Sequence, residues 1–130
     1  MTPRVLIANR GEIASRLIRA CQELGFEAVA AFSDADRSAR WVAQADRSVE
    51  IGPAPAAKSY LNSEAILAAA NDCGATAIHP GYGFLAENSD FAAAVKDSGL
   101  IWVGPEPECI RVMGDKSSAL SVAESASVPI

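Results

Sequence analysis

The chain has 130 residues, a length that fits one domain, and its 50% hydrophobic and 21% charged residues are typical of a globular protein. The formal net charge is −5, which argues against nucleic acid or an anionic membrane surface as a partner, because both attract a basic face. The first apolar run ends at Asn9 and is too short for a signal peptide, and no apolar stretch approaches the length of a membrane span. We therefore expect a cytoplasmic protein.

Short apolar runs typical of buried strands alternate with segments of helical periodicity along most of the chain. The predicted strands cover residues 4–9, 27–33, 48–51, 75–79 and 100–103. The predicted helices cover residues 11–24, a short stretch around Trp41, a segment from Asn62 or Ser63 to Cys73, residues 89–98, and much of the chain after 104. Residues 33–37 and 80–84 read as loops.

Strands that are apolar without alternation, joined by helices, predict a parallel sheet that is covered on both faces. The expected fold is an α/β, Rossmann-like, doubly wound sheet of about five strands in the order 3-2-1-4-5. Ligands of such sheets bind at the carboxyl ends of the strands, beside the point where the strand order reverses. That point lies between the first and fourth strands, so we expect the loops at residues 9–12 and 79–84 to lie together and to carry the function.

Two nucleotide-binding motifs are incomplete. A dinucleotide-binding turn needs several glycines after the first strand, but only Gly11 is present, although Asp34 could serve as the ribose-binding acid. A phosphate-binding P-loop is suggested by Lys116 followed by Ser117, but both glycine requirements fail there. From its surroundings alone, Lys116 reads as a solvated lysine.

Cysteine and histidine usage gives no sign of a metal centre. Cys21, Cys73 and Cys109 are far apart and form no C-x-x-C pair, so we expect buried structural thiols. The single histidine, His79, reads as a hydrogen-bonded turn residue, and no serine, histidine and aspartate set is apparent. A carboxylate pair between Glu12 and Glu87 across the switch point is a further alternative.

Several motifs stand in a fixed order along the chain. They are IANRGEIA at 7–14, SDAD at 33–36, IGPA at 51–54, YLN at 60–62, HPGYGFLAEN at 79–88 and MGDK at 113–116. Taken together, over about residues 4–129, they resemble the biotin carboxylase family. The resemblance implies a pre-ATP-grasp N-terminal domain over residues 1–112 and, from 113 to 130, the start of the connection to an ATP-grasp region.

Enzymes of the family use ATP, Mg²⁺ and bicarbonate to carboxylate biotin on a carrier domain. They belong to acetyl-CoA carboxylase of fatty acid biosynthesis and to propionyl-CoA, methylcrotonyl-CoA, pyruvate and urea carboxylases. The resemblance implies four partners: the remainder of the biotin carboxylase, a biotin carboxyl carrier domain, a carboxyltransferase component, and a second copy in a homodimer. The acceptor is selected by another component, so this sequence does not identify it.

The resemblance also implies roles for particular residues. Lys116 matches an ATP-binding lysine, and Tyr82 and Gly83 match a loop beside the biotin site. A plain turn with a packed aromatic ring is the alternative for that loop. Three residues at helical spacing match a dimer contact, with a solvated polar face as the alternative: Arg16, Arg19 and Glu23.

The family's catalytic residues, its Mg²⁺ carboxylates and its bicarbonate-binding residues would lie beyond residue 130. We therefore expect no catalytic residue, no metal ligand and no tightly bound cofactor in this chain, and no activity for the 130-residue polypeptide alone. The alternative is a free-standing Rossmann-like binding or regulatory module without catalysis.

Overall fold

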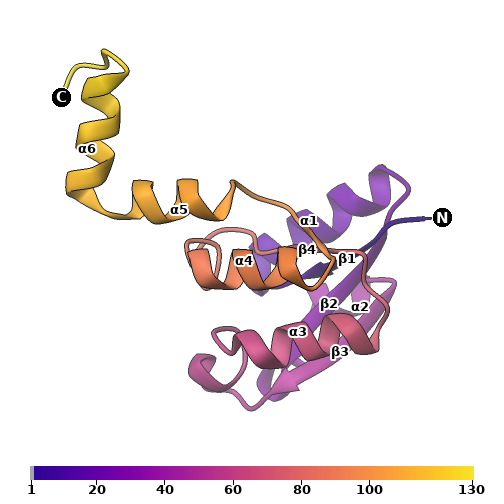
Figure 1. The fold of residues 1–130 in the computed structure, drawn as a ribbon. Helices are drawn as coiled ribbons and strands as arrows, with labels where there is room; N and C mark the ends of the chain where they lie inside the picture. The colour runs from indigo at the N-terminus through magenta and orange to yellow at the C-terminus, as the bar shows by residue number, and fades with distance from the viewer. Residues whose placement is uncertain (1) are drawn as a thin grey trace.

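The computed structural model describes residues 2–130 and contains alternating strands and helices (Figure 1). In chain order the elements are β1 (Arg4–Ile7), α1 (Gly11–Glu23), β2 (Glu27–Ser33), the 3-10 turn η1 (Asp34–Asp36), α2 (Arg40–Gln44), β3 (Arg47–Gly52), the 3-10 turn η2 (Ala56–Lys58), α3 (Ser63–Asp72), β4 (Ala77–His79), α4 (Ser89–Asp97), β5 (Ile101–Trp102), α5 (Pro107–Gly114) and α6 (Lys116–Ser125).

The five strands form one sheet in the order β3-β2-β1-β4-β5, and every pairing is parallel. This confirms both the predicted fold class and the predicted strand order. Strand β1 is central, with Leu6 opposite Val29 of β2 on one side and Ile78 of β4 on the other. The strand order therefore reverses at β1 and β4, which brings the loops that follow these two strands to the same edge of the sheet.

Both faces of the sheet are buried, which explains why the strands show no polar alternation. Val5 and Ile7 of β1 belong to a core shared with α1 and α2, whereas Leu6 belongs to a second core shared with α3 and α4. Ile18 of α1 and Phe91 of α4 are among the largest buried side chains of these two cores. The two cores fix the central strands, and with them the ends of β1 and β4.

Three of the helices are capped at their N-terminus by a polar side chain. Asn62 Oδ1 accepts a hydrogen bond from Ala65 N (3.1 Å), so Asn62 caps α3. Asn88 and Asp115 cap α4 and α6 in the same way, with distances of 2.9 Å in each case. Such caps satisfy backbone N–H groups that have no partner within the helix.

Helices α5 and α6 extend away from the sheet, and α6 turns sharply from the direction of α5 (Figure 1). Helix α5 buries Ile110 against the core, but α6 contributes no buried residue. Helix α5 also runs across the boundary expected between residues 112 and 113.

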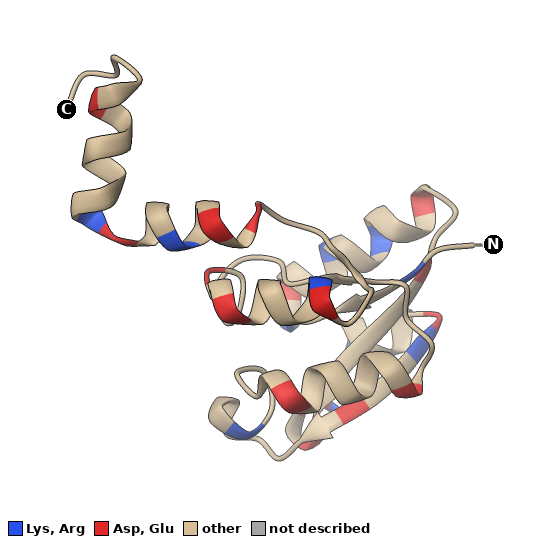
Figure 2. Cartoon of the chain, in the orientation of Figure 1, with Lys and Arg blue, Asp and Glu red and all other residues tan. Residues whose placement is uncertain are grey.

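Basic and acidic positions are interspersed along the helices in the orientation of Figure 2. None of the described helices is both long and apolar enough to span a bilayer.

Candidate binding edge at the switch point

The loops after β1 and β4 are joined by the side chain of Asn9. Its Nδ2 donates hydrogen bonds to the carbonyl oxygens of Pro80 and Tyr82, each at 2.8 Å, and its Oδ1 accepts one from Arg10 N at 2.8 Å. Asn9 is only 1% exposed. The predicted adjacency of residues 9–12 and 79–84 at the carboxyl edge of the sheet is therefore confirmed.

Loop 79–84 depends on backbone conformations that favour glycine. Gly81 and Gly83 have φ values of +67° and +74°. A Cβ on Gly81 would lie 2.7 Å from Asn9 Nδ2 and 2.9 Å from Ile13 Cγ2, so a side chain has no room there. The resulting bend leaves the Tyr82 side chain 72% exposed. Tyr82 is thus not the packed aromatic ring of the plain-turn alternative.

His79 holds the start of the same loop. Its Nδ1 accepts a hydrogen bond from Gly81 N at 3.0 Å, which confirms the predicted turn role. Burial lowers the pKa of His79, because removal from water disfavours the charged imidazolium. The neutral ring with its proton on Nε2 is the form that can accept from Gly81.

An open pocket of about 420 Å³ lies beside this loop. Its lining combines the first half of α1 with the loop after β4: Glu12, Ile13, Arg16, Leu17, His79, Gly81 and Tyr82. The structure thereby brings together Tyr82, expected beside biotin, and Arg16, expected in a dimer contact.

A charged cluster that sequence reasoning did not single out supports the loop from the β2 side. Asp36 is only 8% exposed and accepts two hydrogen bonds from Arg10, at 2.7 Å from Nε and 2.6 Å from Nη2. The Tyr60 hydroxyl donates to Asp36 Oδ2 at 2.7 Å and accepts from Ser33 N at 3.0 Å. The Tyr60 ring stacks on Phe84 with centroids 5.2 Å apart, which links the cluster to loop 79–84.

The electrostatics of this cluster follow from its contacts. Hydrogen bonds from Arg10 lower the pKa of Asp36, against the opposing effect of burial. Burial and the hydrogen bond to Asp36 raise the pKa of Tyr60 to about 12. Asp36 is thus held ionised and Tyr60 neutral. Asp34, the residue considered as a ribose-binding acid, is exposed and makes no side-chain hydrogen bond within residues 2–130.

The structure does not bring Lys116 to loop 79–84. Lys116 is exposed at the first position of α6, which stands away from the sheet edge (Figure 1). It forms no ion pair with residues 2–130. A free ammonium group at this position is available to an anionic ligand.

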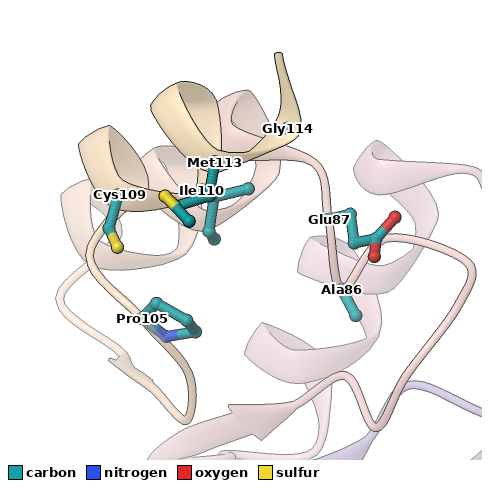
Figure 3. A pocket seen from close by; sticks show the side chains of 7 residues that line it. All are labelled: Ala86, Glu87, Pro105, Cys109, Ile110, Met113 and Gly114. Carbon is teal, nitrogen blue, oxygen red and sulfur yellow. The ribbon is translucent and has the colours of Figure 1, made fainter. Parts of the chain in front are cut away.

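A second pocket lies between α5 and the segment that precedes α4 (Figure 3). Glu87 and Ala86 stand on one side of it, Ile110 and Met113 of α5 on the other, and the remaining lining residues are Pro105, Cys109 and Gly114. Glu87 lines this pocket while Glu12 lines the pocket at the loop, and they share no hydrogen bond. The structure therefore gives no support to a Glu12–Glu87 carboxylate pair.

The expectation of three buried thiols is wrong for two of them. Cys21 of α1 is buried, but Cys73 is half-buried and Cys109 is exposed. Cys109 is exposed because α5 buries only its Ile110 face. Within residues 2–130, no group of three or more histidine, cysteine, aspartate or glutamate side chains is placed to hold a metal ion.

The predicted dimer residues share an exposed face of α1. Arg16, Arg19 and Glu23 are all exposed, opposite the buried Ala14 and Ile18. None of the three forms an ion pair inside the described part of the chain. Their charges are therefore available to a partner.

Known proteins resemble this chain over nearly its whole length. Residues 1–110 match the family model for the biotin carboxylase N-terminal domain. Over 129 residues the chain is 59% identical to the biotin carboxylase of Allochromatium vinosum and 60% identical to that of Pseudomonas aeruginosa, covering 99% of this chain in both cases. It is 54% identical over 127 residues to the mitochondrial methylcrotonoyl-CoA carboxylase subunit alpha of Oryza sativa, covering 98% of this chain and 17% of that subunit.

Solved structures give the same result. The biotin carboxylase domain of a thermophilic 2-oxoglutarate carboxylase, bound to bicarbonate, has a TM-score of 0.94 and 48% identity over 99% of this chain and 29% of that domain. The complete pyruvate carboxylase of Rhizobium etli has a TM-score of 0.92 and 38% identity, covering 99% of this chain and 13% of that enzyme. The chain spans 29% of the length of the two bacterial biotin carboxylases. On this evidence the chain belongs to the biotin carboxylase N-terminal domain family.

Proposed function

We propose that this chain is the N-terminal domain of an ATP-dependent biotin carboxylase, which forms carboxybiotin from ATP, bicarbonate and carrier-bound biotin. The observation that carries the proposal is the exposed Tyr82 loop, held by Asn9 at the switch point of a sheet that matches biotin carboxylases over 99% of the chain. The domain's own part is to bind and orient substrates, with the reacting groups and the Mg²⁺ site supplied outside residues 2–130.

Lys116 is the proposed contact to ATP. An ammonium group on a flexible side chain suits a phosphate oxygen as a mobile point charge. Its exposure and its lack of an ion partner in the described chain support this role. Asp115 stays engaged as the cap of α6 through Ser118 N, so its carboxylate is directed at the helix and not at Lys116.

Tyr82 and Gly83 are the proposed flank of the biotin site. Biotin presents a polar ureido group and an apolar bicyclic body. The Gly83 bend has open space where a side chain would be, which allows close approach of a ligand to the backbone. The exposed Tyr82 ring offers an apolar surface beside it.

The larger assembly is also part of the proposal. Residues 1–112 form the domain proper and 113–130 begin the connection to the ATP-grasp region of the same enzyme. The exposed α1 face with Arg16, Arg19 and Glu23 contacts a second copy in a homodimer. A biotin carboxyl carrier domain and a carboxyltransferase component complete the cytoplasmic enzyme, with ATP, Mg²⁺ and biotin as its cofactors. Acetyl-CoA carboxylase of fatty acid biosynthesis is one such parent.

The test is fixation of labelled bicarbonate into free biotin by the polypeptide encoded by the whole reading frame. We expect acid-labile label in biotin that requires ATP. The isolated 130-residue chain should give no turnover, because the Mg²⁺ carboxylates and bicarbonate-binding residues that the family resemblance implies are not among these residues. A whole protein that fixes no label in biotin would instead favour a binding or regulatory module.

A further inference from the structure

The side chain of Asn9 satisfies three partners in one orientation. Its Nδ2 faces two carbonyl oxygens, those of Pro80 and Tyr82, while its Oδ1 faces the N–H of Arg10. Exchanging the amide oxygen and nitrogen would set oxygen against both carbonyls and nitrogen against a donor. Only an amide side chain, used as a double donor and single acceptor, fits this position.

Within residues 2–130, the two carbonyls accept no hydrogen bond other than those from Asn9. No backbone N–H among residues 2–130 donates to the carbonyl of Pro80 or of Tyr82. The Tyr82 side chain makes no hydrogen bond within those residues and is 72% exposed, so it does not anchor the loop itself. Among the described residues, the carbonyls of Pro80 and Tyr82 are therefore held by the amide of Asn9, while the Gly83 carbonyl accepts a hydrogen bond from Ala86 N at 2.9 Å.

Close packing between Asn9 and Gly81 makes the contact between Asn9 and loop 79–84 specific. Gly81 lies so near Asn9 that a Cβ would come within 2.7 Å of Nδ2, and the buried Asn9 is itself fixed at the end of β1. Asn9 is thus a buried residue just after β1 that contacts the loop directly.

We propose that Asn9 is a positioning residue for biotin: it acts through the loop and sets where Tyr82 and Gly83 meet the ligand. This rests on the proposed function. The proposal predicts an effect on biotin and not on ATP, because Lys116, the proposed ATP contact, lies on α6, outside the Asn9 contacts. Disturbing Asn9 should impair the use of biotin and leave the use of ATP nearly unchanged.

The experiment compares Asn9→Asp with Asn62→Asp in the full-length enzyme, with free biotin as the probe. Asn9→Asp places a carboxylate oxygen, which cannot donate, opposite two carbonyl oxygens. Asn62→Asp is the control, because Asn62 caps α3 through Oδ1 alone and an aspartate keeps that acceptor. For Asn9→Asp we expect the KM for biotin to rise about tenfold or more, with the KM for ATP within about twofold. Asn62→Asp should leave both constants within about twofold of wild type.

A second variant keeps the test decisive if Asn9→Asp does not fold. Asn9→Ser removes the amide without introducing a charge and should also give a biotin-selective rise in KM, of about three- to tenfold. If either folded variant leaves the KM for biotin unchanged, or raises both KM values together, Asn9 has only a structural role and the inference is overturned. A wild-type enzyme that shows no biotin-dependent turnover would refute the proposed function itself, which is a separate outcome.

Discussion

The Tyr60 hydroxyl donates a 2.7 Å hydrogen bond to Oδ2 of Asp36, and both residues are almost completely buried. The same hydroxyl accepts from Ser33 N, and the same carboxylate accepts both hydrogen bonds from Arg10. These contacts join the ends of β1 and β2, and the stacked Phe84 extends them to loop 79–84.

Removing the hydroxyl of Tyr60 should destabilise the chain. Tyr60→Phe keeps the ring on Phe84 but leaves the buried Ser33 N–H without its acceptor, a loss of about 1–3 kcal/mol in the free energy of unfolding. Urea denaturation followed by tryptophan fluorescence measures this. Tyr82→Phe is the matched control, with a change below about 0.5 kcal/mol because Tyr82 is exposed. Equal midpoints for the two variants would contradict the assignment.

The stability of the chain should fall in acid in a way that depends on Asp36. Arg10 holds the pKa of Asp36 below its ordinary value, which is about 3.9 in an unfolded chain. The ionised carboxylate therefore contributes stability that is fully present above about pH 4 and is lost as pH falls through the lower folded pKa. Asp36→Asn should be less stable at pH 7 and should lose less further stability between about pH 4 and 2. Melting temperatures across this range would show it, and slopes matching those of the exposed Asp34→Asn control would argue against it.

The three thiols should differ in reactivity. Burial raises the pKa of Cys21 and of Cys73, which lowers their thiolate fraction, whereas Cys109 is exposed on α5. In the native chain, an aromatic disulfide reagent should modify Cys109 rapidly and Cys73 more slowly, with Cys21 protected until urea is added. Cys109→Ser should remove the fast phase. A fast phase that persists in that variant would show that another thiol is accessible.

If the full-length enzyme forms the proposed homodimer, the α1 face should contribute to it. An isologous contact allows Arg19 to meet Glu23 of the second copy. Arg19→Glu should weaken the dimer, and adding Glu23→Arg should partly restore it. Lys58→Glu, the same charge reversal on the exposed turn η2, is the control. Sedimentation velocity measures the balance, and if the Arg19 and Glu23 variants all behave like Lys58→Glu, this face is only solvated.

The isolated 130-residue chain should be monomeric at micromolar concentration. Exposed ion pairs contribute about 0–1 kcal/mol each, well below the free energy needed to associate two chains. A stable dimer of the isolated chain would show that more surface than the α1 face takes part.

Periodicity and turn residues were sufficient to predict the strand order and the sheet edge at which loops 9–12 and 79–84 meet. Residues 4–7 are apolar at every position after Arg4, which indicates burial on both faces, and Gly81 and Gly83 mark the bend after β4. Asn62 is recognisable as a cap because its partner, Ala65, is three residues away. Features of this kind depend on neighbours in sequence, or on rules for how parallel strands connect.

The support beneath the loop could not be predicted in the same way. Asp34 and Asp36 lie two residues apart in one turn, and nothing local shows that Asp36 is buried against Arg10 while Asp34 is exposed. The contact from Asn9 to Tyr82 spans 73 residues and exists only once β1 and β4 are paired. The exposure of Cys109 likewise depends on how α5 leaves the sheet.

The division of binding between Lys116 and loop 79–84 is the central claim, and a crossed comparison in the full-length enzyme tests it most directly. Lys116→Ala removes one charge-assisted contact of about 1.5–3 kcal/mol and should raise the KM for ATP roughly ten- to over a hundredfold. Tyr82→Ala removes an apolar flank and should raise the KM for biotin about tenfold. Each variant should leave the other KM within about threefold of wild type, as Lys58→Ala should leave both. If both variants shift both constants alike, or neither shifts its own substrate, the account is wrong.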